Sequence, residues 1–453
     1  MSEILREKKI KDIIDIILKT GKEFAPFVFV TVFSIKDALT RFGDNEITQN
    51  VYREHVTADI RLSKDKKSTS VSIDRFDVDY LKESFKKAIE ILKFQKPDED
   101  YPELPKSIDY IKELPSWCKS TSELTPEKRA EVIKNLAEKC QEKSLISSGI
   151  VSNNEGIIAI ASSDGLYAFH ESSKAKYSAT VMDDNGDSGW VEYATNDVDN
   201  IDFDKATSLV INKAILNKSP KDMEIGEYTV ILEPQAVSDI LLFLSYIGFS
   251  TMKYYEGDSP FSGKLEQKIF SDKISIIDNA YNQINPGMPF DMEGNKKKQL
   301  EIVKDGVFKE LPYDIKLSKK YNKVPTGHGF AYPNSNGPLC TNLQILPGKR
   351  KMDDIINSSD KCLLVTHFHY TNIINPNDLT FTGMTRDGIF WIENGDISYP
   401  VKNFRFTESI IKALNNIVEV SAEQEFASGF FGGGFICPAL KIDNFRFSSK
   451  TDY

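Results

Sequence analysis

Hydrophobic and polar positions in the N-terminal half of the chain follow a helical and a strand-like period in turn. Apolar residues recur at helical spacing from about Ile10 to Thr20 and from Asp77 to Phe94, which predicts two amphipathic helices. Between them, the β-branched and aromatic run Phe27 to Phe33 predicts a strand. Three alternating stretches predict further strands: Glu46 to Asn50, Val56 to Leu62 and Ser68 to Ile73.

The same order repeats after a proline-rich segment. The stretch QKPDEDYPELPKSIDYIKELP carries four prolines and many charges, which indicates a boundary. Thr125 and Pro126 then begin a helix, because threonine caps free N–H groups and proline loses no hydrogen bond at the first helical position. Strand-like stretches between Ser144 and Tyr193 and a helix from about Phe203 to Leu216 complete the repeat. We expect two similar α+β units, or one two-layer domain built from them.

The pattern changes after Ile225. EYTVILEP predicts a strand, PQAVSDILLFLSYIGFSTM predicts a helix, and many short strands separated by Gly, Asn and Pro follow. Within the helix, DILLFLSYIGF is apolar almost all round, which indicates that it is buried. The sequence therefore predicts an α+β protein in three parts. These are two α+β units at 1–100 and 101–222, and a β-rich C-terminal domain with one buried helix at 223–453.

Composition and charge narrow the class of protein. The 453 residues carry a formal net charge of -10 and no basic domain, so we expect no nucleic-acid partner. The 5 cysteines are scattered without a CxxC pair, which argues against a zinc knuckle or a disulfide framework and fits a reducing cytoplasm. No signal peptide is visible, and no apolar run approaches the roughly 20 residues that span a bilayer. We therefore expect a cytoplasmic protein with no membrane partner.

Two histidines, His367 and His369, lie two residues apart in VTHFHYTN. Residues at this spacing in a strand share one face, which is a way to begin a metal site. A metal site normally needs three or four protein ligands, and no spacing singles out a third among His328, Cys340, Cys437 or the carboxylates. The favoured interpretation is a pair of polar residues that line a cavity, with a metal pair as the alternative.

A second stretch, GMTRDGIFWIENGDI, places Arg386 and Asp387 before Gly388 between two β-rich runs. A guanidinium group suits bidentate binding of a carboxylate, including the end or a side chain of a peptide. We expect the substrate cavity to be lined by residues of both stretches: His367, His369, Tyr370, Asn372, Arg386 and Asp387.

These stretches resemble the TldD/PmbA family, the TldD/TldE peptidase proteins. Segments that resemble the family follow in family order over most of the chain: RFGDNEITQN, GEYTVILEPQAVSDILLFL, FDMEGNKKKQLEIVKDGVFKEL and HFHYTNIINPNDLTFTGMTRDGIFWIENGDISYPVKNFRF. The resemblance implies an α+β N-terminal half, a β-rich C-terminal domain and work on peptides.

The family has two kinds of subunit, and the TldD kind carries an HExxxH helix that binds zinc. By resemblance this motif falls on Leu242 to Ile247, where the sequence reads LFLSYI. Leu242, Phe243 and Ile247 supply neither a zinc ligand nor a base. The resemblance therefore implies a PmbA/TldE-like subunit with no catalytic residue, metal or cofactor of its own. The implied partners are a zinc-bearing TldD-like subunit, a peptide substrate and, when the chain is alone, a second copy of itself.

Two functions follow from these observations. The first is a metal-free subunit that binds and positions peptides for proteolysis or peptide maturation by the zinc-bearing partner. The alternative is a peptidase in its own right, which uses His367 and His369 for a metal or for acid–base chemistry. The family also carries the label of a modulator of DNA gyrase, and the acidic charge gives no support for direct DNA binding.

Overall fold

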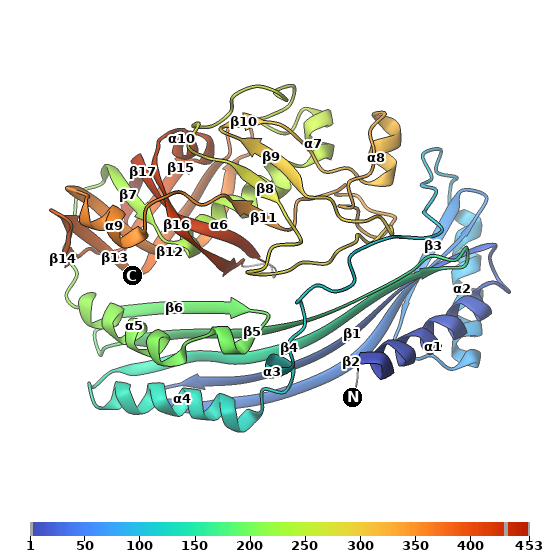
Figure 1. The fold of residues 1–453 in the computed structure, drawn as a ribbon, viewed down its shortest axis with the longest axis horizontal. Helices are drawn as coiled ribbons and strands as arrows, with labels where there is room; N and C mark the ends of the chain where they lie inside the picture. Colours follow the sequence, from blue (N-terminus) through green and yellow to red (C-terminus); the bar gives the residue numbers. More distant parts are fainter. Residues whose placement is uncertain (1–2, 430–433, 452–453) are drawn as a thin grey trace.

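The N-terminal half forms one antiparallel six-stranded sheet, in the order β3-β2-β1-β4-β5-β6 (Figure 1). The structure is a computed structural model that describes residues 3–429 and 434–451. The strands are β1 (Phe27–Gly43), β2 (Glu46–Lys64), β3 (Lys67–Ile73), β4 (Ile146–Ser162), β5 (Tyr167–Met182) and β6 (Ser188–Thr195). The helices are α1 (Glu3–Gly21), α2 (Val78–Phe94), α3 (Lys119–Ser122), α4 (Pro126–Gln141), the short η1 (Val198–Asn200) and α5 (Phe203–Leu216).

Helices α1 and α2 pack on one end of this sheet and α4 and α5 on the other, each pair over its own apolar cluster (Figure 1). Thr125 caps α4 as predicted, because its side chain accepts a hydrogen bond from the backbone N–H of Lys128. Buried Arg129 fixes α4 to the sheet by donating to Thr40 Oγ1 at 3.0 Å and to Asn153 Oδ1 at 2.7 Å. The two helix–strands–helix units thus share a single sheet.

The strands of this sheet are longer than the alternation predicts. The stretches Glu46 to Asn50 and Val56 to Leu62 belong to the single strand β2, and β1 continues ten residues beyond Phe33 to Gly43. The intervening residues of β2 are mostly exposed, so they carry no hydrophobic period to mark them as strand. Their strand conformation comes from pairing with β1, where Lys36 to Leu39 face Glu54 to Val51.

The C-terminal half is built on an 11-stranded mixed sheet, and its predicted β-rich character is confirmed. Its strands are β7 (Gly226–Leu232), β8 (Ile276–Asp278), β9 (Leu300–Lys304), β10 (Val307–Phe308), β11 (Leu343–Ile345), β12 (Lys361–Asn375), β13 (Thr380–Glu393), β14 (Asp396–Pro400), β15 (Phe404–Ser409), β16 (Ile417–Ser428) and β17 (Gly434–Lys450). Its helical segments are α6 (Pro234–Phe243), the π-helical η2 (Leu244–Gly248), α7 (Thr251–Glu256), α8 (Ile315–Lys320), α9 (Met352–Asn357) and α10 (Ile410–Asn415). Because β17 pairs with both β15 and β7, strands β7, β12, β13, β15 and β17 close into a ring.

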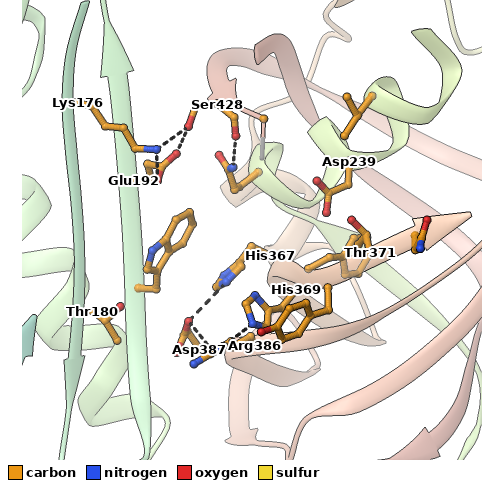
Figure 2. Close-up of a pocket in the computed structure, with 17 residues that line it drawn as sticks. Lys176, Thr180, Glu192, Asp239, His367, His369, Thr371, Arg386, Asp387 and Ser428 are labelled. Carbon is orange, nitrogen blue, oxygen red and sulfur yellow. Dashed lines mark hydrogen bonds and ion pairs between the residues drawn. The ribbon is translucent and has the colours of Figure 1, made fainter. Parts of the chain in front are cut away.

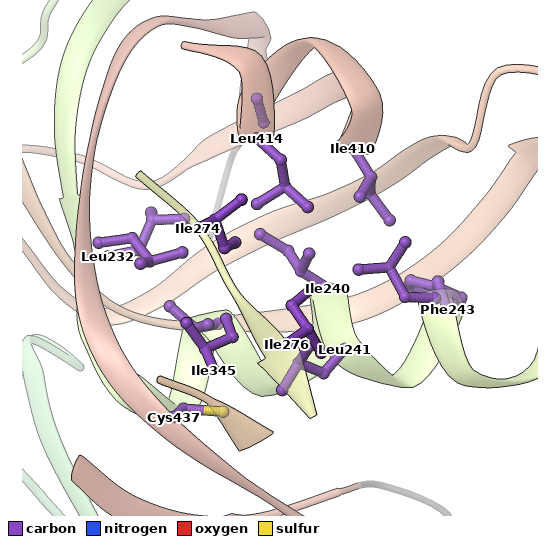
Figure 3. Close-up of a cluster of buried hydrophobic side chains, with 14 of the residues drawn as sticks. Leu232, Ile240, Leu241, Phe243, Ile274, Ile276, Ile345, Ile410, Leu414 and Cys437 are labelled. Carbon is purple, nitrogen blue, oxygen red and sulfur yellow. The ribbon is translucent and has the colours of Figure 1, made fainter. Parts of the chain in front are cut away.

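The predicted buried helix ends earlier than its apolar pattern suggests. α6 stops at Phe243, and the chain continues as a π-helical turn in which the N–H of Phe249 bonds to the Leu244 carbonyl at 2.7 Å. Ile240, Leu241 and Phe243 pack among residues such as Ile276 and Leu414 (Figure 3). No helix among the residues that the structure describes is long and apolar enough to cross a membrane.

The two halves meet face to face. The C-terminal half lies over the sheet face opposite the helices (Figure 1). Phe290 from the C-terminal half is fully buried in a cluster with N-terminal residues, and its ring lies 5.0 Å from that of Tyr110. A cavity remains between β5 and β6 on one side and α6, β12 and β13 on the other.

Candidate functional site

The cavity has a volume of about 570 Å³, and both halves of the chain line it (Figure 2). The C-terminal half supplies residues of α6, β12, β13 and the end of β16, and the N-terminal half supplies residues of β5 and β6. All six residues predicted from the sequence line this one cavity: His367, His369, Tyr370, Asn372, Arg386 and Asp387. The structure therefore brings the predicted set together.

Two irregularities in the pairing of β12 with β13 shape this wall. Between the pairs His367–Arg386 and Val365–Ile389, β13 has one more residue than β12, and between His369–Met384 and Asn372–Thr382, β12 has one more. The extra residues include Asp387 at φ 54° and Tyr370 at φ 52°, a left-handed conformation that non-glycine residues seldom adopt. Such bulges re-aim side chains beside functional sites. Here they bracket the short paired stretch of β12 from His367 to His369, which lines the cavity.

Gly388 follows Asp387 in the β13 bulge at φ 126°. A Cβ atom at this position would lie 2.9 Å from the Phe390 ring and 3.1 Å from the Thr366 hydroxyl. Glycine is therefore needed here both for its backbone conformation and for the close approach.

The two histidines occupy different environments. His367 is 8% exposed, and burial together with the neighbouring cations Lys213 and Arg386 lowers its pKa to about 3. Burial and the Arg386 charge also lower the pKa of His369. Both imidazoles are therefore neutral at physiological pH, and His369 Nε2 accepts a hydrogen bond from Arg386 Nη1 at 2.6 Å.

Asp387 joins the two halves of the site. Its Oδ1 accepts a hydrogen bond from Ser188 of β6 at 2.6 Å, and its Oδ2 lies 3.5 Å from His367 Nε2 and 3.7 Å from Arg386 Nε. Burial raises the pKa of this carboxyl, and Ser188 and Arg386 oppose the rise. With a proton on Nε2 directed at Asp387, His367 presents Nδ1 as an acceptor, and this buried atom has no partner among the described residues.

The opposite wall was not found from the sequence. Trp190 of β6 lies against His367 with ring centroids 4.2 Å apart. Lys176 of β5 pairs with Glu192 of β6 at 2.9 Å, and Glu192 also bonds to the hydroxyl of Ser428. Alternation along β5 and β6 marks these residues as sharing a face, but only the tertiary structure shows that the face meets β12.

Asp239 of α6 was also missed. It points from the helix into the cavity beside Thr371 (Figure 2). Burial raises the pKa of the Asp239 carboxyl, and a hydrogen bond with the Thr371 side chain opposes part of the rise, which leaves the pKa at about 7. A signal was present in the sequence, since Asp239 is the one charged residue in the apolar run DILLFLSYIGF. An ionisable group on a buried helix marks either an ion pair or a functional position.

The cavity opens into a second one of about 950 Å³. The two share Thr180, His369, Tyr370, Arg386 and Asp387 as lining residues. Tyr370, which is 76% exposed, and the hydrogen-bonded pair of His369 and Arg386 therefore stand at the junction between the cavities. The two cavities therefore adjoin at these residues.

The residues at the positions where the family's zinc motif would fall do not fit a zinc ion. Leu242 lines the cavity, whereas Phe243 is 2% exposed and packs against Phe381 with ring centroids 6.0 Å apart. Ile247 is buried in the same apolar cluster. None of the three side chains carries a donor atom, and no step of a reaction can pass through zinc at this helix. Among the residues that the structure describes, no group of three His, Cys, Asp or Glu side chains is arranged to hold a metal ion.

Comparisons with known proteins agree with this fold. The Methanocaldococcus jannaschii protein MJ0231, which is uncharacterized, is 23% identical over 370 residues, or 80% of this chain and 83% of that one. The metalloprotease PmbA homologue of Haemophilus influenzae is 24% identical over 66% of each chain. A match to the metalloprotease TldD homologue of Buchnera aphidicola spans 47% of that protein, so about half of its length is compared.

Solved structures and family descriptions complete the comparison. The crystal structure of TldE from Thermococcus kodakarensis superposes with a TM-score of 0.85 at 23% identity, over 96% of this chain and 100% of that one. Residues 225–449 match the PmbA/TldA metallopeptidase C-terminal domain, and residues 119–218 match the PmbA/TldA metallopeptidase central domain. These two matches, together with the ring of strands and the α6 helix that lie within them, show that the chain belongs to the PmbA/TldD metallopeptidase family.

Proposed function

We propose that this protein is a metal-free, PmbA/TldE-like subunit that binds peptides and positions them for a zinc-bearing TldD-like partner. The observation that carries the proposal is the side-chain chemistry of α6 and η2. By the resemblance, the TldD kind of subunit carries HExxxH at these positions. This chain instead has Leu242 at the cavity and Phe243 and Ile247 in the apolar core. A subunit without ligands or a base at this place contributes by binding and orientation, which lower a barrier without chemistry of its own.

The cavity supports a peptide ligand. It combines an aromatic wall at Trp190, a guanidinium group at Arg386 whose side chain is 52% exposed, and small polar side chains such as those of Asn372 and Thr371, which can bond to a peptide backbone. Peptides present carbonyl and N–H groups along their length together with side chains of mixed polarity, and two adjoining cavities with mixed polar and aromatic walls suit such a ligand. Arg386 has donors left over for a carbonyl or carboxylate oxygen of the ligand.

The alternative, a peptidase that uses His367 and His369, receives less support. His369 Nε2 already accepts a hydrogen bond from Arg386, and the guanidinium charge 2.6 Å away would repel a metal cation. Burial holds His367 neutral with its Nε2 directed at Asp387. Two histidines alone also fall short of a metal site, which needs three or four ligands.

The test is a peptidase assay on this chain, on a TldD-like partner and on the mixture, with unstructured peptides and added zinc. We expect no turnover by this chain alone, and turnover by the mixture above that of the partner alone. His367→Ala serves as the diagnostic variant for the alternative. Metal-dependent turnover by this chain alone that His367→Ala abolishes would overturn the proposal.

A further inference from the structure

The ionisable side chains of the cavity leave one carboxylate without a counter-charge. Lys176 pairs with Glu192 at 2.9 Å, and Arg386 lies 3.7 Å from Asp387. Burial keeps both histidines neutral, as described above. Asp239 remains, with no ion pair to any described residue. In its ionised form it gives the cavity an unbalanced negative charge at one end, away from Arg386 (Figure 2).

The surroundings of α6 do not supply the missing cation. Burial raises the pKa of the Cys437 thiol on β17, and the carboxylates of Asp239 and of Glu425 on β16 add to the rise, so neither Cys437 nor Glu425 supplies a cation. Lys213 of α5 is bonded to Glu233 at 2.7 Å at the start of α6. A carboxylate that burial disfavours, and that has the Thr371 hydroxyl but no cation as a partner, is costly in the free protein, so a site that contains one has a use for it in the complex.

We propose that Asp239 binds a primary ammonium group of the peptide ligand, either the N-terminal α-amine or a lysine side chain. This inference rests on the proposed function, because it names the feature of the peptide that the cavity recognises. An ammonium group has three donors and no acceptor, and it suits a carboxylate together with a neutral acceptor. His367 Nδ1 is such an acceptor on the same cavity wall, and it has no partner among the described residues.

The opposite polarity at the other end of the cavity gives the ligand a direction. Arg386 donates to His369 Nε2, which leaves the Nδ1 proton of His369 and the remaining guanidinium protons to face acceptors. A peptide bound through its N-terminal ammonium group at Asp239 therefore runs from Asp239 toward Arg386 in the N-to-C direction. From there the chain can continue into the second cavity, which shares Arg386 as a lining residue.

The experiment compares three fluorescent peptides of one sequence by anisotropy. The first has a free N-terminus and no lysine, the second is N-acetylated without lysine, and the third is N-acetylated with one lysine. We expect the second to bind at least about tenfold more weakly than the first. Whether the third regains affinity distinguishes a side-chain ammonium from an α-amine. Equal affinity of the wild-type protein for the first and second peptides, with no gain for the third, would overturn the inference while leaving peptide binding intact.

The variant Asp239→Asn keeps the size of the side chain and removes its charge. We expect it to bind all three peptides with nearly the same affinity, whereas Asp258→Asn, on an exposed residue outside the cavity, should keep the wild-type preference. Retention of the preference by Asp239→Asn would count against Asp239 as the recognising group. Absence of binding by every peptide, even with a TldD-like partner present, would instead overturn the proposed function itself.

Discussion

At the scale of single residues, Asp239 is at odds with the stability of the free protein. Its pKa in the folded state, about 7, lies above the roughly 3.9 of an unfolded chain. The folded state therefore holds this proton more tightly, and the contribution of Asp239 to stability is present below about pH 4 and is lost as the pH rises through 7. At neutral pH and above, the protein would therefore be more stable with an uncharged side chain at this position than with the Asp239 carboxylate.

The corresponding prediction concerns Asp239→Asn. At pH 8 the variant should be more stable than the wild-type protein, by on the order of 2 kcal/mol, because the buried charge is gone. At pH 4, where the wild-type carboxyl is protonated, the difference should nearly vanish. Urea unfolding at both values of pH measures it. A variant that is less stable than the wild-type protein at pH 8 would show that Asp239 is held by interactions other than those described.

The sequence predicts the residues of this site unevenly. His367, His369 and Arg386 were found because histidines and an arginine stand out in β-rich stretches that also resemble a family. Trp190, Lys176 and Glu192 were not, since they come from strands more than 170 residues earlier, and only the docking of the two halves brings them to the cavity. Local patterns give the face of a strand, whereas the partner of that face is a long-range property.

At the scale of elements, α6 and η2 determine which side chains face the cavity and which face the core. Leu242 lines the cavity, while its neighbour Phe243 packs against Phe381 and Tyr246. The apolar pattern predicted this burial correctly, but not the change to a π-helical turn at Leu244. Gly248, at the end of this turn, lies so close to Phe261 that a Cβ atom would approach the Phe261 ring to 3.0 Å, and a helical period cannot reveal such a tertiary contact.

Two adjacent substitutions test this division. Phe243→Glu should destabilise the protein by about 4 kcal/mol, because it removes a buried ring and buries a carboxyl group without a partner. Leu242→His should change stability by no more than about 1 kcal/mol, since the imidazole can reach the cavity. Chemical unfolding of the two variants gives the comparison. Equal stability of the two would mean that Phe243 does not pack in the core.

At the scale of the whole molecule, the two halves are joined by apolar contacts as well as by the site. Phe290 inserts into a cluster with Phe29, Tyr110, Ile160 and Leu166 of the N-terminal half. The predicted α+β class is confirmed, and the expected boundary near residue 100 falls in the segment 95–118, which has no helix or strand. The sequence left open whether the two N-terminal units stay separate, because a shared sheet depends on β1 pairing with β4 across about 100 residues.

The prediction at this scale is that Phe290 couples the unfolding of the halves. Phe290→Ala should lower stability by about 3–5 kcal/mol and should broaden or split a single thermal transition, because the N-terminal sheet retains its own clusters under α1, α2, α4 and α5. Phe330→Ala, on a residue that is 37% exposed, is the control and should leave the transition sharp. Differential scanning calorimetry distinguishes the outcomes. An unchanged, cooperative transition for Phe290→Ala would contradict the coupling.

The packing of α6 and η2 also restricts how the chain can evolve. An HExxxH pattern at this place would require Leu242, Phe243 and Ile247 to change together, because no single replacement completes a set of ligands and a base. Phe243 and Ile247 lie in the apolar core, so each intermediate sequence that replaces either of them would lose stability before it gained any activity. The packing of this segment therefore opposes the stepwise acquisition of a metal site. Substitutions at the cavity wall can change what the cavity binds, whereas the acquisition of an HExxxH metal site would pass through poorly folded intermediates.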